Sequence, residues 1–422
     1  MPGWAGASGS SGDRELLGLL QRRALAYFLD NQLPGGLIRD RQVNIGPLRD
    51  IGPCSVAATG MGLIAIALAS AEPYRLVSHR EAIVRVRAAV ETAYFCLPHD
   101  RGILPHFIDP DSGKAWGSDV FSTVDAAWLL AGALWASAFL GEPGLVDLAG
   151  RLYNRVDWRY WSLSDRSTRP GLIRHGKGPG GRFLPCCWDR ANGETILMYV
   201  LGAGAEPDRA LPASAWSSTR PFYGEAGSRR FNNADLGLFV FQYGLDMLDL
   251  GRWRSPCGLD LMAEAATATA ANRDACMARS AEFRTYRRHW GLSAGDGPGR
   301  SPRTDVYESY SPAGPIDGTA HLTATLASIA HCPGDVLDNV RVAADGGRGL
   351  SPLGRYGLGS INEDRRWVAR DMVGIDAGAV VLALDNVLAE DRVRAVFHSL
   401  SWVERGLDRM GFCDASTVRR AS

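Results

Sequence analysis

The sequence predicts an all-α protein built as an (α/α)6 barrel, a toroid of six helical hairpins. Three observations support this prediction. Twelve segments place their apolar residues at helical spacing. Segments that are apolar all round alternate with segments that are apolar on one side only, and strand signals are scarce. A closed double ring requires this alternation, because inner helices touch neighbours on every side while outer helices keep one face in water.

The first five helical segments show the alternation most clearly. Residues 14–31 carry an apolar stripe with a period of 3.6 residues. Residues 54–70 are small and apolar throughout, which predicts a helix buried on all sides, and residues 79–97 are amphipathic. The same two types recur at residues 122–140 and 143–158. These segments therefore predict an inner and an outer layer of helices.

Seven further helical segments complete the set, at residues 192–203, 231–249, 258–288, 319–331, 333–344, 376–389 and 391–409. We expect one large domain over residues 14–410, a flexible segment at 1–13 and a C-terminal tail at 411–422. A multi-domain helical protein or an α-solenoid would also contain many helices. The absence of a repeat of fixed period and of a polar linker in the sequence weakens both alternatives.

Composition and charge exclude several classes of function. The 422 residues contain 46 Lys and Arg and 46 Asp and Glu, so the formal net charge is zero. Nucleic acids and anionic membranes attract basic surfaces, so neither is an expected partner. We see no uncharged apolar run long enough to predict a transmembrane helix. The first residues lack signal-peptide features, which predicts a cytoplasmic protein, or a periplasmic or secreted one if a signal was removed. The oligomeric state stays open.

Cysteines and short motifs give no sign of a cofactor. The eight cysteines include no C-x-x-C pair, and the eight histidines lack the spacing of metal ligands, so we expect no metal site and no cofactor. Most cysteines are expected to be small buried residues. The sequence also lacks the G-x-S-x-G, Walker and H-E-x-x-H motifs.

Long loops precede alternate helices, most of them the apolar ones, so we expect the loops at one end of the ring, where a cleft would form. They span residues 32–53, 98–121, 161–191, 204–230, 289–318 and 345–375. They combine Asp or Glu with Trp or Tyr and with Gly. Aromatic faces beside carboxylates suit a sugar, because its C–H faces pack on aromatic rings while its hydroxyls form hydrogen bonds. Each aromatic taken alone could equally be a packing residue.

Four acidic residues lie at the start of, or within, apolar helical segments: Asp125, Glu194, Asp317 and Asp376. A buried carboxylate is costly, so each needs a reason. N-capping is one reason, and it fits Asp317 and Asp376. Cleavage of a glycosidic bond, which needs two carboxyls, is another. Desolvation of Glu194 would keep it protonated as an acid, whereas a helix N-terminus would favour the ionised form of Asp376, as a base needs.

Several stretches resemble one family when they are taken together and in order. They are Gln21 to Arg23 with Tyr27 and Phe28, Gly36 to Arg41, Ser55 to Gly60, Gly102 to Asp109, Ser122 to Asp125, Leu129 to Leu134, Val156 to Trp158, Glu194 with Ile196 and Leu197, Trp290 to Pro298, Asp317 to Thr319 and Gly374 to Gly378. Over residues 16–407 the chain resembles the glucoamylase-like family that includes bacterial endo-β-1,2-glucanases and domains of cyclic β-1,2-glucan synthases.

The resemblance implies an (α/α)6 barrel with a catalytic domain at residues 14–410 that hydrolyses a β-glucan, with β-1,2-glucan as the first candidate and inversion at the anomeric carbon. Glu194 matches the general acid, Asp376 a second carboxylate on the base side, and Asp125 a third acid near the cleft. The residues expected to bind substrate are Arg41, His106, Asp109, Gln242, Tyr243, Trp290, Asp296 and Asp317.

Two departures from the family pattern would alter the sugar subsites. The family commonly has a His-Gln-Tyr-Ser-His run where this chain reads Phe241-Gln242-Tyr243-Gly244-Leu245. The segment Cys186 to Arg190 also replaces a tyrosine-rich form. Two alternatives therefore stay open: a glucan transglycosylase that uses the same cleft, and a glycan-binding domain without catalysis.

Overall fold

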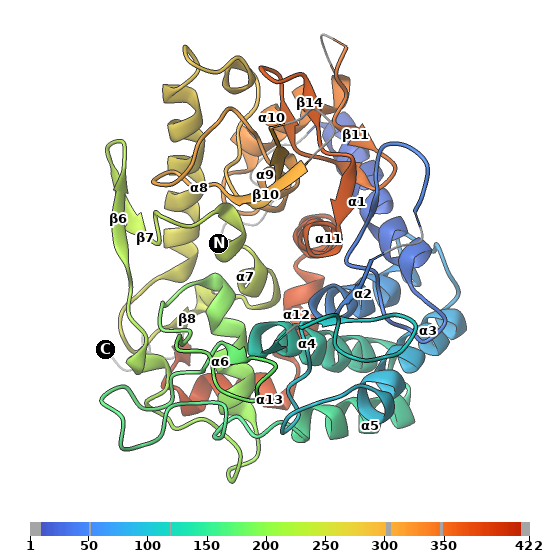
Figure 1. The fold of residues 1–422 in the computed structure, drawn as a ribbon, viewed down its shortest axis with the longest axis vertical. Coiled ribbons are helices and arrows are strands. Elements are labelled where there is room, and N and C mark those ends of the chain that lie inside the picture. Colours follow the sequence, from blue (N-terminus) through green and yellow to red (C-terminus); the bar gives the residue numbers. More distant parts are fainter. Residues whose placement is uncertain (1–9, 50–51, 119, 301–304, 347–348, 415–422) are drawn as a thin grey trace.

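The computed structural model describes residues 10–49, 52–118, 120–300, 305–346 and 349–414. Thirteen α-helices dominate this part of the chain, and long loops with short β-hairpins join them (Figure 1). The helices are α1 (Ser11–Asn31), α2 (Val56–Ala69), α3 (His79–Glu91), α4 (Thr123–Leu140), α5 (Pro143–Asn154), α6 (Gly193–Gly204), α7 (Tyr243–Met247), α8 (Leu261–Ala278), α9 (Leu322–Ala327), α10 (Pro333–Asp345), α11 (Gly374–Leu388), α12 (Arg392–His398) and α13 (Ser401–Arg409).

Sixteen short strands form eight two-stranded antiparallel sheets within the described residues. They are β1 (Arg41–Val43), β2 (Cys54–Ser55), β3 (Phe107–Ile108), β4 (Phe121–Ser122), β5 (Gly176–Lys177), β6 (Tyr223–Ala226), β7 (Arg229–Asn232), β8 (Trp253–Arg254), β9 (Ala294–Pro298), β10 (Asp305–Ser309), β11 (Leu353–Gly354), β12 (Gly357–Leu358), β13 (Ile361–Asn362), β14 (Trp367–Val368), β15 (Asp371–Val373) and β16 (Cys413–Asp414). This corrects the expectation of few strands. Most of these strands are too short to show the period-2 alternation by which a strand is recognised in sequence.

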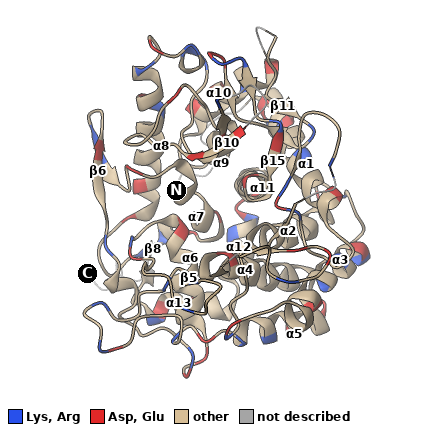
Figure 2. Cartoon of the chain, in the orientation of Figure 1, with Lys and Arg blue, Asp and Glu red and all other residues tan. Residues whose placement is uncertain are grey.

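The helices that are apolar all round form the centre of the molecule. All 14 residues of α2 are buried, and α4, α6 and α11 are buried along most of their length. Helix α2 packs against α4 and α11, α4 against α6, α6 against α7, and α9 against α11. By contrast α3, α5 and α10 bury one face, and charged residues lie mostly in such helices and in loops (Figure 2). The predicted alternation of buried and amphipathic helices is confirmed for these elements.

Two glycines allow α2 and α4 to cross at very short distance. A Cβ atom on Gly132 would lie 1.9 Å from the carbonyl oxygen of Gly60, and a Cβ atom on Gly60 would lie 2.2 Å from the carbonyl oxygen of Trp128. Any larger residue would force the two backbones apart, because a close-packed interior has no space to absorb the clash. The composition of small residues noted in both segments therefore reflects direct contact between helix backbones.

The β-pairings fix the loops that precede the inner helices. Strand β1 pairs with β15 in the register Arg41 with Val373, immediately before α11 begins. Strand β4 pairs with β5 in the register Ser122 with Gly176, immediately before α4. Strand β2, which leads into α2, pairs with β3. The loops are therefore tied by hydrogen bonds to the N-terminal ends of α2, α4 and α11.

Three predicted helical segments differ from the structure. Residues 231–249 contain the end of β7, a 3-10 turn and only the five-residue helix α7. Residues 258–288 contain α8, which ends at Ala278, and residues 391–409 contain two helices instead of one. The break between α12 and α13 falls at Ser399 and Leu400, where Leu400 has extended backbone angles. Serines on either side of this break favour helix ends because their hydroxyls compete for backbone hydrogen bonds.

The chain ends differ in part from the predicted domain boundaries. Helix α1 begins at Ser11, where Ser10 and Asp13 form a capping box, so it starts before the predicted boundary at residue 14. At the other end β16 pairs with β8, which attaches the first part of the predicted tail to the domain. The remainder of both predicted end segments, residues 1–9 and 415–422, lies outside the described residues.

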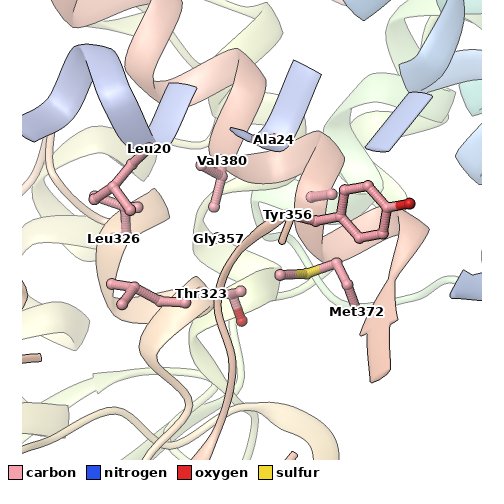
Figure 3. Close-up of a pocket in the computed structure, with 10 residues that line it drawn as sticks. Leu20, Ala24, Thr323, Leu326, Tyr356, Gly357, Met372 and Val380 are labelled. Atoms are coloured by element: carbon pink, nitrogen blue, oxygen red, sulfur yellow. The ribbon is translucent and has the colours of Figure 1, made fainter. Parts of the chain in front are cut away.

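A small apolar cavity lies between α1, α9 and α11 (Figure 3). Leu20, Leu326 and Val380 line it from the three helices, and Tyr356 and Met372 line it from the adjoining loops. Its lining contains neither a carboxyl nor a basic side chain. The cavity is therefore a packing void in the core and has no catalytic chemistry.

Helix α4 is the only helix in the described residues that is long and apolar enough to cross a membrane. Of its residues, 78% are buried inside the protein. A central helix of a soluble fold has the same composition as a membrane span, so this observation is weak evidence for a membrane.

The cysteines are less buried than the sequence analysis expects. Cys54 and Cys276 are buried, whereas the other six free thiols are partly or fully exposed. Cys186 and Cys187 lie in the long loop before α6, and such loops run over the surface. The prediction that most cysteines are core residues was therefore wrong.

Candidate active site

Three carboxyl residues occupy equivalent places in the first turns of buried helices. Asp125 is the third residue of α4, Glu194 the second of α6, and Asp376 the third of α11. The cap of α6 is a capping box made by Asn192 and Thr195, so Glu194 does not cap its own helix. No side chain caps α11, whose N-cap residue is Val373. N-capping therefore does not explain Asp376, which corrects that alternative.

Glu194 occupies an apolar environment next to a second carboxyl. Desolvation, followed by the negative charge of Asp125, raises the pKa of Glu194 to about 8. Close contact between α6 and α7 contributes to this environment, because a Cβ atom on Gly244 would lie 2.0 Å from the carbonyl oxygen of Gly193. Glu194 is therefore protonated at neutral pH, as a general acid must be.

Asp125 connects Glu194 to the loop that contains His106. The Ser122 hydroxyl donates a short hydrogen bond to Asp125 Oδ2, and His106 Nε2 lies 3.7 Å from Asp125 Oδ1. The His106 ring stacks on Phe107, with ring centroids 3.7 Å apart. These contacts hold the His106 imidazole between Asp125 and the next group of charges.

That next group consists of Asp40, Arg41 and Asp296. Arg41 Nη1 lies 3.1 Å from Asp296 Oδ2, and Arg41 Nε lies 3.4 Å from Asp40 Oδ2. Burial raises the pKa of both aspartates, while the adjacent guanidinium lowers it. His106 also lowers the pKa of Asp40. Arg41 is therefore held between two carboxyls at the start of β1.

Asp376 lies beside this charged group. Desolvation, followed by the charge of Asp296, raises the pKa of Asp376 to about 7, and Arg41 acts in the opposite direction. Asp296 and Asp376 line the same small cavity, and the amide of Gly374 donates a 2.6 Å hydrogen bond to the carbonyl oxygen of Asp40. The pKa of Asp376 is therefore close to neutral pH, which suits a base.

Two tyrosines complete the arrangement. Tyr243 is buried, and after desolvation the charges that raise its pKa are those of Asp376, Tyr307 and Glu194. Tyr307 is 54% exposed and pairs with Asp296 across the β9–β10 hairpin. Partial burial and then the charges of Asp376 and Asp296 raise the pKa of Tyr307. The charges of Asp376 and Glu194 therefore both act on Tyr243, and that of Asp376 also acts on Tyr307.

Ion contacts, together with the effects of neighbouring charges on pKa values, link these polar side chains into one group, which we call the polar circuit. Taken in order, its members are Glu194, Asp125, His106, Asp40, Arg41, Asp296, Asp376 and Tyr243, and Tyr243 returns to Glu194. They come from seven separate segments of the chain. Side chains from so many segments meet at the N-terminal ends of the inner helices, and this position defines the candidate site.

Four residues expected to bind substrate have structural roles instead. Gln242 is 1% exposed, and its amide donates to the Ala324 carbonyl and to the Ser328 hydroxyl, each at 2.6 Å. Trp290 is 3% exposed and belongs to the core. Neither Gln242 nor Trp290 is exposed to a ligand, because each side chain is enclosed in the packed interior.

Asp109 and Asp317 organise turns. Asp109 Oδ1 accepts hydrogen bonds from the Ser112 amide at 2.8 Å and from the Ser112 hydroxyl at 2.9 Å, and these bonds lower the pKa of Asp109. Asp317 accepts from the Thr319 amide at 2.9 Å and from the Tyr310 hydroxyl at 3.1 Å. Their carboxyl oxygens thus accept hydrogen bonds from residues of the same loops, and neither aspartate is part of the polar circuit.

Sequence reasoning missed three participants. Asp40 and Ser122 lie close in sequence to the predicted site residues Arg41 and Asp125. The position of Asp40 directly before Arg41 could have indicated that it belongs to the site. Tyr307 lies in a short exposed strand and belongs to no recognisable motif. Only the pairing of β10 with β9 brings it beside Asp296.

Solved structures share this fold. A putative glucoamylase from Bacteroides uniformis has a TM-score of 0.82 and 20% identity over 97% of this chain and 99% of that chain. An endo-β-1,2-glucanase from Chitinophaga pinensis, in a complex with sophorotriose and glucose, has a TM-score of 0.81 and 18% identity over 96% and 99%. An endo-β-1,2-glucanase from Talaromyces funiculosus with sophorose has a TM-score of 0.65 and 11% identity over 95% and 90%. At these identities the likeness shows that the fold is that of glucoamylase-like helical enzymes.

The family assignment rests on the sequence itself. Residues 186–401, about half of the chain, match the family model Glycoamylase, described as putative glucoamylase. The chain therefore belongs to the Glycoamylase family, as the sequence resemblance predicts. No match to a curated protein is found. Glu194 and Asp376 lie within the matched region, whereas Arg41, His106 and Asp125 precede it.

Proposed function

We propose that this protein is a glycoside hydrolase that cleaves a β-glucan, with β-1,2-glucan as the first substrate to test. The observation that carries the proposal is the polar circuit, in which burial raises the pKa of Glu194 to about 8 and that of Asp376 to about 7, and the charges of both carboxyls act on Tyr243. Membership of the Glycoamylase family and the fold shared with two endo-β-1,2-glucanases support it.

The proposed scaffold is a closed (α/α)6 barrel within one domain. Helix α2 contacts α4, α4 contacts α6, α6 contacts α7, and α9 contacts α11, which returns to α2. The turn at Leu238–Phe241 contacts α6, α7 and α9, and in the proposed ring it links α7 to α9. A ring of this kind would place the first turns of α4, α6 and α11 together at one end of the barrel.

The chemistry follows from the two pKa values. Glu194 donates its proton to the glycosidic oxygen as the bond to the anomeric carbon breaks. Asp376, directly or through a relay, takes a proton from a water molecule whose oxygen bonds to the anomeric carbon from the opposite face. The products are a shortened glucan and a new reducing end with inverted configuration.

The remaining members of the circuit suit sugar recognition. Asp40, Arg41, Asp296 and His106 offer hydrogen-bond donors and acceptors to hydroxyl groups. Tyr307 offers an exposed ring on which the C–H face of a pyranose can pack. The Arg41 guanidinium also counterbalances the charges of the surrounding aspartates, which limits the cost of keeping them partly buried.

Digestion of a panel of glucans tests the proposal, with the anomer of the first product observed by NMR. We expect reducing sugars from β-1,2-glucan, with the α-anomer appearing first. Longer or cyclic products would indicate a transglycosylase instead. Binding without cleavage of any member of the panel would indicate a glycan-binding domain and overturn the assignment as an enzyme.

A further inference from the structure

We propose that Phe222 forms a sugar-binding subsite on the leaving-group side of the cleft and sets the affinity for longer glucans. This inference rests on the proposed hydrolase function, because it assigns the leaving-group side from the role of Glu194. Phe222 is 50% exposed and lies in the loop at residues 204–230, which the sequence places at the cleft, but it was not among the residues expected to bind substrate.

Backbone pairing places Phe222 beside the start of α6. Arg190 and Arg220 form a parallel bridge, and the Ala191 amide donates a 3.0 Å hydrogen bond to the Arg220 carbonyl oxygen. The Asn232 side chain links the same two segments, because it bonds both the Phe222 amide and the carbonyl oxygen of Ala191, which directly precedes the N-cap residue of α6. Glu194 is the second residue of that helix. The segment that contains Phe222 is therefore attached directly before α6, the helix that carries the proposed proton donor.

The Phe222 ring is held firmly in place. The Arg190 guanidinium lies over the ring, 4.1 Å from its centroid, and Arg190 Nη1 contacts both carboxyl oxygens of Asp235 at 2.8 Å. The Phe222 amide donates a 2.7 Å hydrogen bond to Asn232 Oδ1, and Asn232 Nδ2 donates to the carbonyl oxygen of Ala191. A rigid ring binds a ligand without first losing conformational freedom.

The chemistry of this ring favours a sugar. Arg190 covers one face, and half of the side chain is still exposed, so the other face can receive the C–H groups of a pyranose. Tyr223 is also exposed, but its ring contacts Arg230 of β7 and thus points away from Arg190, as alternation along an extended segment requires.

The reaction fixes which sugar unit Phe222 would contact. Glu194 protonates the oxygen that leaves with the departing part of the glucan, so the groups next to Glu194 face that part. Asp376 and Tyr307 lie at the water side of the cleaved bond. Phe222 therefore binds one of the units that depart, and its contribution should grow with the length of the substrate.

The test compares Phe222→Ala with Tyr223→Ala as a matched control, using β-1,2-glucan polymer and sophorotriose as substrates. For the polymer we expect Phe222→Ala to raise KM about fivefold to tenfold, the effect of one lost stacking contact, while kcat stays within about twofold. Phe222→Trp should restore the KM of the wild type, and Tyr223→Ala should match the wild type. Circular dichroism verifies that each variant is folded.

The outcomes separate this inference from the proposed function. A wild-type protein that cleaves neither substrate refutes the proposed function on these glucans. A wild-type protein that cleaves the polymer, with the KM of Phe222→Ala equal to that of Tyr223→Ala, overturns the subsite alone. If Phe222→Ala does not fold, Phe222→Leu, which keeps an apolar side chain but no ring, gives the same comparison.

Discussion

Arg41 and Asp296 are 255 positions apart in the chain, yet the guanidinium and the carboxyl meet at 3.1 Å. The pairing of β1 with β15 and of β9 with β10 brings them together at the start of α11. Asp296 raises the pKa of Asp376, and Arg41 lowers it. This single ion pair thus couples two loops to the carboxyl on the proposed base side.

Replacement of Glu194 tests the proposed general acid. Glu194→Gln keeps the size of the side chain but cannot donate a proton, so we expect kcat to fall by about 10²–10⁴. Affinity for the glucan should change little, since the shape of the cleft is preserved. Release of reducing sugar measures the first effect and calorimetric titration the second. Turnover at the wild-type rate would exclude Glu194 as the acid.

The activity should depend on pH as a bell-shaped curve. Asp376 acts when ionised, so the rate rises as pH increases through its pKa of about 7. Glu194 acts when protonated, so the rate falls as pH increases through its pKa of about 8. We therefore expect the maximum of kcat/KM between these values. A maximum near pH 5 would contradict the assignment of these two groups.

Replacement of Arg41 should shift only one side of that curve. The positive charge lowers the pKa of Asp376, so Arg41→Gln should move the rising side to higher pH by about one unit. The falling side should stay, since Arg41 is not among the groups that shift the pKa of Glu194. Arg49→Gln is the control, because Arg49 pairs with Asp371 at 2.5 Å in the same region. Equal profiles for the two variants would refute the coupling.

The raised pKa of Asp376 also predicts an effect on stability. Because this pKa lies above its ordinary value of 3.8, the fold favours the protonated carboxyl, and stability is lost as pH rises through about 7. Asp376→Asn should therefore be more stable than the wild type above pH 8, by about 1–2 kcal/mol, and similar to it near pH 4. Thermal unfolding at both pH values measures this. Asp147→Asn, at a side chain that is 68% exposed, should show no such difference.

The crossing of α2 and α4 predicts a strong effect of a single methyl group. Gly132→Ala would place a Cβ atom 1.9 Å from the Gly60 carbonyl oxygen, so we expect destabilisation of about 3 kcal/mol or loss of folding. Gly18→Ala in α1 meets nothing within 4 Å and should be neutral or stabilising by up to about 1 kcal/mol. Denaturant unfolding compares the two variants. Equal stability would contradict the close contact of the two helices.

The inner helices were predictable because their chemistry is local. The apolar residues of α2 and α4 make a helix that is buried on all sides whatever its neighbours are. Glu194 and Asp376 stood out for the same reason, since a carboxyl in an apolar helix is costly without a function. The prediction of one long helix at residues 231–249 was wrong, because the polar and glycine residues of this segment allow only short helical turns between β7 and α8.

The sequence by itself determined that the protein is helical, which helices are buried, and which acids lie at their first turns. Only the tertiary structure decided which loop residues join those acids. Gln242 and Trp290 have the chemistry of sugar ligands but are buried in the core. The pairing of the distant strands β1 and β15 brings Asp40 to the start of α11, and the β9–β10 hairpin carries Tyr307, whose pKa the charge of Asp376 raises. The physical reason is that periodicity reports contacts within one helix, while a site built from several loops depends on packing between segments that the sequence does not place side by side.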